Sequence, residues 1–231
     1  MIDFKINSDI SKAESIDSVF YTDSKYLDIS INKIFQKSWQ LACHKSQLSD
    51  TNIYPITFLD DYISEPLVIT KSNNSINCLS NVCTHRGHII NDKDCTRKKM
   101  RCEYHGRTFE LDGSIDKMPG FKGVKNFPSE NDNLKKVPIL EWNDFIFTSI
   151  IPEIRIDSVL DDINNRLKKF PFNNIAYRPD LSKTYHLNAH WALYCENYLE
   201  GLHVPYVHKG LNNEIDIKSY KTEILDNGVL Q

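Results

Sequence analysis

The chain has 231 residues, 40% of them hydrophobic and 26% charged, with a formal net charge of -3 at pH 7. This composition is typical of a globular protein with room for one large domain or two modest ones. Its Lys and Arg residues are dispersed apart from "RKKMR" at Arg97 to Arg101, and the absence of a basic face argues against nucleic acid or an anionic membrane as a partner.

The first residues, "MIDFKINSDISKAE", lack the basic and apolar regions of a secretory signal. No apolar run approaches the ~18 residues that a membrane span requires. In such a chain the six cysteines are expected to be thiols or metal ligands, since disulfide frameworks belong to secreted proteins. We therefore expect a cytoplasmic protein in a reducing compartment, with no membrane association.

The first predicted elements are a helical region followed by strands. Ile29, Ile34 and Trp39 recur at roughly helical spacing within a pattern that runs over residues 10–39. Then "PLVITKSNNSINCLSNVC" predicts two strands around an Asn73–Asn74 turn, and "RTFELDGSI" predicts two more around Asp112–Gly113. With "DFIFTSII" as the last strand, residues up to about 150 form a small antiparallel β domain.

A second helical region follows. In "DSVLDDINNRLKKF", Asp157 is a plausible N-cap, and apolar residues up to Leu167 and Phe170 fall on one face. The stretch "HWALYCENYLEGLH" is expected to be helical until Pro205 stops it. The final "KSYKTEILDNGVLQ" predicts a strand and a turn without a following partner, so this second domain looks incomplete.

Two short stretches, "CTHRGH" and "CEYHGRTF", each pair a cysteine with a histidine: Cys83 with His85, and Cys102 with His105. Thiolate and imidazole ligands suit zinc or an iron-sulfur cluster. Structural zinc sites favour Cys-x(2–4)-Cys knuckles, whereas one Cys and one His per loop suit two irons, the sulfurs on one and the imidazoles on the other. That is the ligand set of a Rieske [2Fe-2S] centre, with zinc as the alternative.

The stretch from about residue 38 to 150 resembles the Rieske domain of the Rieske-type non-haem iron oxygenases, through "CTHRG", "CEYHG" and the "FELDG" hairpin. Downstream, "ENYLEGLHVPYVH" places His203 and His208 five residues apart, where they converge only if the helix breaks between them. Two imidazoles and one carboxylate form the facial triad of non-haem Fe(II) oxygenases. This segment resembles the mononuclear-iron helix of the same family.

Glu200 lies three residues before His203, on the same helical face. The resemblance implies that this acidic residue bridges a Rieske histidine of one subunit to an iron-ligating histidine of the next in a homotrimer. Many aromatic-ring dioxygenases have Asp at this position. The Glu is closer to the branch of the family, including choline monooxygenase, that oxidises quaternary amines.

The resemblance also implies an α+β fold in three parts. Residues 1–37 are an N-terminal helical segment packing on the catalytic part, residues 38–150 are the Rieske domain, and residues 151–231 begin a helix-grip (START-like) catalytic domain. In the family the third iron ligand is an aspartate more than a hundred residues beyond the His pair, and here only Asp216 and Asp226 follow. We therefore expect an N-terminal piece of an α subunit that forms the cluster but lacks a complete iron site and is inactive by itself.

The function implied is O2-dependent mono- or dioxygenation of a small organic substrate. Electrons from NAD(P)H would reach the Rieske cluster through a separate reductase, with or without a ferredoxin, and pass by way of Glu200 to the mononuclear Fe(II). The alternative is a Rieske-type electron-transfer protein without oxygenase chemistry of its own, which would have no use for "ENYLEGLHVPYVH". The sequence does not choose a substrate.

Overall fold

A computed structural model describes residues 4–72, 75–225 and 228–231. The chain divides into two compact units. The terminal unit comprises the described parts of Met1–Ile34, Ile156–Ile163 and Lys183–Gln231, and the central unit comprises Phe35–Arg155 and Asn164–Ser182. The predicted domain boundaries at residues 37 and 150 stay predictions. The mixture of strands and helices is α+β, as expected.

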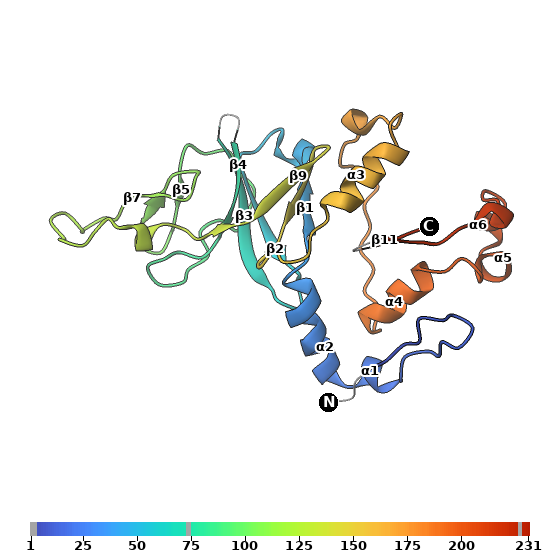
Figure 1. The fold of residues 1–231 in the computed structure, drawn as a ribbon. Helices are drawn as coiled ribbons and strands as arrows, with labels where there is room; N and C mark the ends of the chain where they lie inside the picture. Colours follow the sequence, from blue (N-terminus) through green and yellow to red (C-terminus); the bar gives the residue numbers. More distant parts are fainter. Residues whose placement is uncertain (1–3, 73–74, 226–227) are drawn as a thin grey trace. The chain divides into compact units, whose positions relative to one another are not determined.

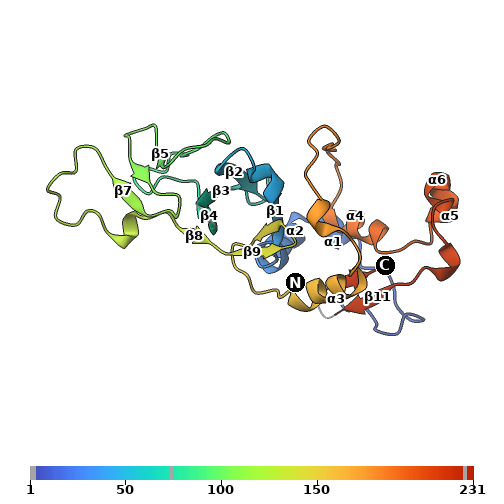
Figure 2. The same ribbon diagram turned by 90° about the horizontal axis from the view of Figure 1, so that it is seen from above.

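The central unit is built from antiparallel strands in three sheets (Figure 1). The first sheet has the order β1-β10-β9 and the second has the order β2-β3-β4-β8, while β5, β6 and β7 form the third. Their bounds are β1 Gln40–His44, β2 Ile53–Phe58, β3 Glu65–Ser72, β4 Ser75–Ser80, β5 Met100–Arg101, β6 Thr108–Phe109, β7 Ile115–Lys117, β8 Lys136–Val137, β9 Ile139–Trp142 and β10 Phe145–Thr148. Figures 1 and 2 both place β5 and β7 far from β1, at the opposite end of this unit.

Strand β3 is the centre of this unit because both of its faces are buried. Leu67, Val68 and Ile69 are all fully inaccessible to solvent. Side chains alternate between the two faces of a strand, so Val68 packs in one hydrophobic cluster while Leu67 and Ile69 pack in another. The Val68 cluster also contains Cys83 and Cys102. The hydrophobic core therefore supports both predicted cysteine ligands directly.

The predicted strand pairs are confirmed. Strands β3 and β4 pair antiparallel from Leu67 with Ser80 to Ser72 with Ser75, although the predicted turn at Asn73–Asn74 lies outside the described residues. Strands β6 and β7 pair around the Asp112–Gly113 turn. Gly113 has φ +88°, a left-handed conformation that favours glycine.

The remaining elements are short helices, 3₁₀ turns and one hairpin. They are α1 Val19–Thr22, α2 Ser24–Ser30, a π-helix Ile31–Phe35, α3 Asp157–Arg166, α4 Trp191–Tyr198, α5 Val204–Val207, α6 Lys209–Asn212, β11 Glu223–Leu225, β12 Gly228–Leu230 and 3₁₀ turns at Lys45–Leu48, Glu130–Asp132, Phe172–Asn174 and Ile217–Ser219. In the part of the chain that the structure describes, no helix has the length and apolar character needed to span a membrane.

Two helix predictions are corrected in their bounds. The helical pattern over residues 10–39 is realised only from Val19 to Phe35, and it is interrupted by Asp23, an extended residue whose side chain caps α2 by accepting a hydrogen bond from Lys25 N–H. In α3, Asp157 is the first helical residue and not the cap, since the Ile156 carbonyl already accepts the Leu160 N–H. That helix ends at Arg166, so Leu167 and Phe170 lie beyond it.

The C-terminal predictions need larger corrections. The helix over residues 190–203 ends at Tyr198, before Pro205, and Pro205 instead lies in the first turn of α5, where a proline costs no helical hydrogen bond. The final strand was expected to lack a partner. In the structure β11 pairs antiparallel with β12, so that prediction is wrong: the last residues of the chain supply the second strand.

Candidate metal centre

The two Cys-His loops close in the same way. In the first, Cys83 N–H donates to the His88 carbonyl at 2.8 Å and Gly87 N–H donates to the Cys83 carbonyl at 2.9 Å. In the second, Cys102 N–H donates to the Arg107 carbonyl at 2.8 Å and Gly106 N–H to the Cys102 carbonyl at 2.9 Å. In both loops the cysteine bonds to the residues four and five positions later. The two stretches therefore have the same backbone closure.

Glycine is required in both loops for a conformational reason. Gly87 has φ +71° and Gly106 has φ +74°, a region that residues with a Cβ rarely adopt. Gly106 is also crowded, since a Cβ there would lie 3.2 Å from Pro119 Cγ. The sequence pattern of Cys followed four residues later by Gly therefore specifies the loop closure.

The loops bring the four predicted ligands into two like pairs. Cys83 and Cys102 are buried, with exposed fractions of 3% and 2%, and belong to the same hydrophobic cluster, where the Cys102 thiol neighbours that of Cys83. The rings of His85 and His105 lie 4.7 Å apart between centroids, at 74° to one another. His85 is half-buried and His105 is exposed. Sulfur faces sulfur and imidazole faces imidazole, which is the division of ligands expected of a two-iron cluster.

The pKa shifts in these loops agree with metal binding. Desolvation lowers the pKa of His85, with a further contribution from neighbouring His105, and the neutral imidazole is the form that ligates metals. Burial raises the pKa of the Cys83 thiol. A metal must therefore displace a proton from this sulfur, which is the usual coupling of thiolate ligation to deprotonation.

These residues fit a [2Fe-2S] cluster. The paired donors meet at the ends of two loops whose backbone closure is complete, and the cysteines sit on the hydrophobic core. The donor set of two thiolates and two imidazoles is that of a Rieske centre, in which two ligands go to each iron. In the described parts of the chain, no three His, Cys, Asp or Glu side chains group around a single ion position, and a cluster with two ligands per iron needs no such group.

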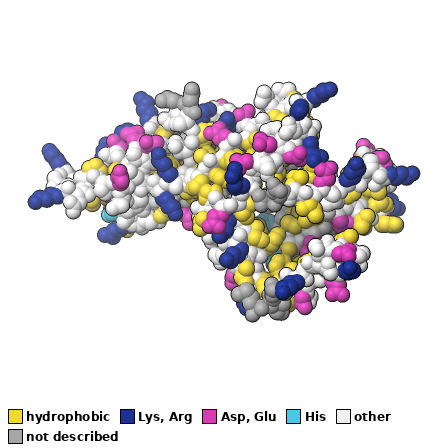
Figure 3. Space-filling model, viewed as in Figure 1, with side chains coloured by type: hydrophobic (Ala, Val, Ile, Leu, Met, Phe, Trp, Pro, Cys, Tyr) yellow, Lys and Arg dark blue, Asp and Glu magenta, His cyan; other side chains and the backbone are white. Residues whose placement is uncertain are grey.

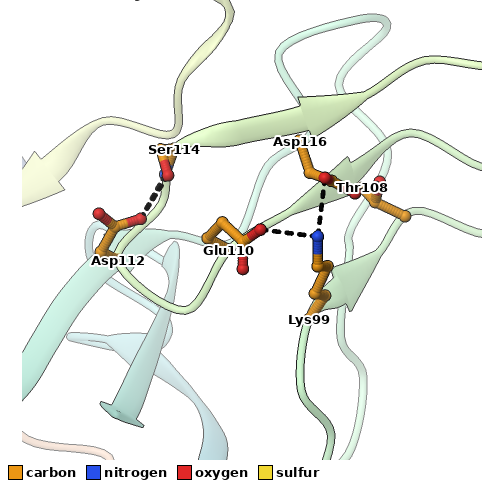
Figure 4. A network of polar contacts seen from close by, with 6 residues as sticks. All are labelled: Lys99, Thr108, Glu110, Asp112, Ser114 and Asp116. Carbon is orange, nitrogen blue, oxygen red and sulfur yellow. Dashed lines mark hydrogen bonds and ion pairs between the residues drawn. The ribbon is translucent and has the colours of Figure 1, made fainter.

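The β5-β6-β7 sheet beneath the second loop is tied by a polar network (Figure 4). Lys99 Nζ contacts Glu110 Oε1 and Asp116 Oδ1, both at 2.7 Å, and Thr108 Oγ1 donates to Asp116 Oδ2 at 2.8 Å. The hydrogen bond from Lys99 lowers the pKa of Asp116. Each exposed ion pair contributes little to the free energy of folding. The network therefore serves mainly to hold the three short strands in register.

The second predicted site lies in the terminal unit. His203 and His208 flank α5 at its two ends, and their ring centroids are 5.1 Å apart. The two histidines therefore converge as expected, but the predicted break between them is wrong: Val204–Val207 are helical, Pro205 included. The break in the helix covers residues 199–203 instead.

Glu200 lies in this break, so the prediction that it shares a helical face with His203 is wrong in its geometry. The two residues nevertheless meet: the Glu200 carboxylate binds His203 Nδ1 and also accepts the Leu202 N–H, at 2.6 Å. The hydrogen bond from His203 lowers the pKa of Glu200. A carboxylate on Nδ1 holds the proton there and leaves Nε2 free as a metal ligand.

Next to Glu200, Gly201 is buried because a tyrosine ring covers it. A Cβ on Gly201 would lie 2.7 Å from Cζ of Tyr220, which allows no side chain. Asp216 side-chain oxygen caps the 3₁₀ turn before Tyr220. Asp226, the other Asp that follows the His pair, lies outside the described residues.

Sequence reasoning missed two residues of the central unit that contact the loops. Arg107 is buried, with an exposed fraction of 3%, and forms an ion pair with Asp132. The signal available in the sequence was an arginine directly before "TF", within a run that otherwise reads as a buried strand.

Comparisons with known proteins agree with this geometry. The Rieske [2Fe-2S] domain family matches residues 38–128, which include both loops. Choline monooxygenase of Arabidopsis thaliana is 27% identical over 96% of this chain and 55% of its own length, and the carnitine monooxygenase oxygenase subunit of Acinetobacter pittii is 28% identical over 99% and 61%. A crystal structure of a quaternary ammonium Rieske monooxygenase with L-carnitine has a TM-score of 0.75 at 25% identity, covering 91% of this chain and 60% of that one. The chain thus spans a little over half the length of these relatives.

Proposed function

Since this chain contains a Rieske [2Fe-2S] domain and is related to the choline and carnitine monooxygenases, we propose that it is part of a Rieske oxygenase α subunit that hydroxylates a small organic substrate with O2. The observation that carries the proposal is the presence of two separate sites on one chain. One is the paired Cys-His loops, and the other is the His203–His208 pair with Glu200 on its first imidazole.

Each group of residues has a role in this proposal. Cys83, Cys102, His85 and His105 hold the cluster, which supplies single electrons when bound. His203 and His208 supply two of the three ligands of a facial triad for Fe(II), a site that leaves positions open for O2. Glu200 orients His203 by its hydrogen bond to Nδ1 and keeps the ligating nitrogen deprotonated. The third ligand stays unassigned.

A quaternary amine is the substrate class that we favour. The relatives are named for choline and carnitine, both of which carry a trimethylammonium group. The Glu at position 200 is consistent with that branch, as the sequence suggested.

The partners follow from the proposed reaction. An NAD(P)H-dependent reductase, directly or through a ferredoxin, would deliver electrons to the cluster. In a homotrimer Glu200 would approach a Rieske histidine of the neighbouring subunit. Its carboxylate is 43% exposed and His105 is also exposed, so both ends of such a bridge are accessible.

The second candidate is an electron-transfer protein that uses only the central unit. It would need the Cys-His loops but neither His203 nor His208, and it leaves the Glu200–His203 contact without a purpose. The two functions separate at the second site, which only the oxygenase requires.

The experiment combines spectroscopy with turnover. After anaerobic loading with iron and sulfide and reduction with dithionite, the protein should show the electron paramagnetic resonance spectrum of a Rieske cluster, and Cys102→Ser should abolish it. In the native gene product, product formation from choline or carnitine with O2 and NADH should fall at least about a hundredfold in His203→Ala. The matched variant His186→Ala, at an exposed histidine of the same unit, should keep activity. A Rieske spectrum without any O2-dependent product formation would favour the electron carrier.

A further inference from the structure

Arg107 is a buried cation at the end of the second cluster loop. Its carbonyl accepts the Cys102 N–H that closes the loop, and it follows His105 by two residues. Only 3% of the residue is exposed. Charged side chains are almost never buried to this extent unless they are paired, so its position needs a reason.

The surroundings fix the guanidinium in place. One terminal nitrogen binds the Asp132 carboxylate, and the guanidinium carbon lies 5.8 Å from the centroid of Phe109 and 5.4 Å from that of Phe127, within cation–π range. The Nε–H is buried and has no hydrogen-bond partner in the described part of the chain. A buried donor of a charged group without an acceptor is unfavourable, which points to an acceptor that the described residues do not provide.

Asp132 connects the guanidinium to the first loop. Its carbonyl accepts the hydroxyl of Thr84 at 2.7 Å, and Thr84 lies between Cys83 and His85. The contacts of Arg107 with Asp132 and of Asp132 with Thr84 thus link the second loop to the first.

We propose that Arg107 is a positioning residue for the Rieske cluster that also raises its reduction potential, and that Asp132 limits the increase. The inference rests on the proposed cluster and adds the residues that tune it. Potentials of iron-sulfur clusters depend on nearby charge, on burial and on hydrogen bonds to the sulfides. Reduction adds one electron to the cluster, and a fixed positive charge in a poorly solvated site stabilises the added negative charge.

The test is a redox titration of the loaded full chain with dithionite, followed by circular dichroism of the cluster. In Arg107→Gln the ratio of reduced to oxidised cluster at a given potential should fall about tenfold, which corresponds to a potential about 59 mV lower for a one-electron couple. Arg107→Lys keeps the charge and should restore most of the potential. Asp132→Asn removes the counter-charge and should shift the potential in the opposite direction, upwards.

Arg86 is the matched control, because it lies in the first loop and its charge also acts on His85, but it is exposed. Arg86→Gln should move the potential much less, since water screens its charge. Equal potentials in the wild type, Arg107→Gln and Asp132→Asn would overturn the proposal, as would shifts of the same sign in both variants. If Arg107→Gln does not retain a cluster, the shift in Asp132→Asn decides alone. Absence of a Rieske spectrum in the wild type would instead contradict the cluster assignment.

Discussion

At the scale of single residues, burial separates the cysteines by reactivity. Burial raises the pKa of Cys43 to about 12 and that of Cys78 to about 11, whereas Cys195 is exposed. Only the thiolate form of cysteine is the nucleophile. At pH 8 about one in a thousand Cys78 side chains is deprotonated, and the deprotonated fraction of Cys43 is smaller still. With iodoacetamide, mass spectrometry of peptides from the native protein should find Cys195 alkylated and Cys43 and Cys78 protected. Labelling in urea is the control, and native labelling of Cys78 at the rate of Cys195 would contradict its burial.

At the scale of elements, the β6-β7 turn depends on a glycine for two reasons. Gly113 has φ +88°, and a Cβ there would lie 2.8 Å from Leu79 Cδ2. Gly113→Ala should lower the free energy of unfolding by about 2–4 kcal/mol, combining left-handed strain of about 1–2 kcal/mol with overpacking. Gly120 is the matched control, since it has φ +80° and no atom within 4 Å of a Cβ. Urea denaturation should show a smaller loss in Gly120→Ala, and equal losses would mean that the contact with Leu79 is relieved.

The same scale shows what local sequence can predict. The β3-β4 and β6-β7 hairpins were predicted because alternating apolar residues and turn residues act within a few positions. The end of α4 at Tyr198 was missed, although Gly201 is a poor helix former. In the break Gly201 packs against the ring of Tyr220, nineteen residues later, and such a distant contact leaves no local pattern. The C-terminal hairpin was missed because β12 is only Gly228–Leu230, shorter than a strand pattern can reveal.

At the scale of the whole molecule, the two units have very different cores. Both hydrophobic clusters lie in the central unit, while the buried apolar side chains described in the terminal unit are Tyr26, Ala192 and Val204. The terminal unit also exposes many apolar residues, and Figure 3 shows hydrophobic side chains at the surface of the right-hand lobe, where Figure 1 places α5 and α6. The exposed apolar residues of the terminal unit include Tyr185, Leu187, Tyr194, Tyr198, Leu202 and Tyr206.

Unequal cores predict unequal local stability. In native-state hydrogen exchange, amides of β3 and β4 should be protected at least about a hundredfold more than those of α4, β11 and β12, because the terminal unit can open while the central unit stays folded. The two sets of amides are internal controls for each other in one sample. Equal protection in both would show that the chain unfolds as a single cooperative unit.

The sites were predictable to different degrees for a physical reason. Metal ligands are restricted to few residue types at fixed spacings, so Cys83, His85, Cys102 and His105 were recognisable from sequence, and the structure brings them together. The ion pair of Arg107 with Asp132 was not, because residues 25 positions apart leave no local pattern that links them. Glu200 was predicted, but its contact with His203 is made by a loop and not by a helical repeat.

The doubled loop has a consequence for access. Both loops close identically from their cysteines, but His85 is the second residue after its cysteine and His105 is the third. That single extra position leaves one imidazole half-covered and turns the other towards solvent. The pair therefore has a more covered member, His85, and a more exposed member, His105. Two loops with the same backbone closure thus expose their histidines to solvent to different extents.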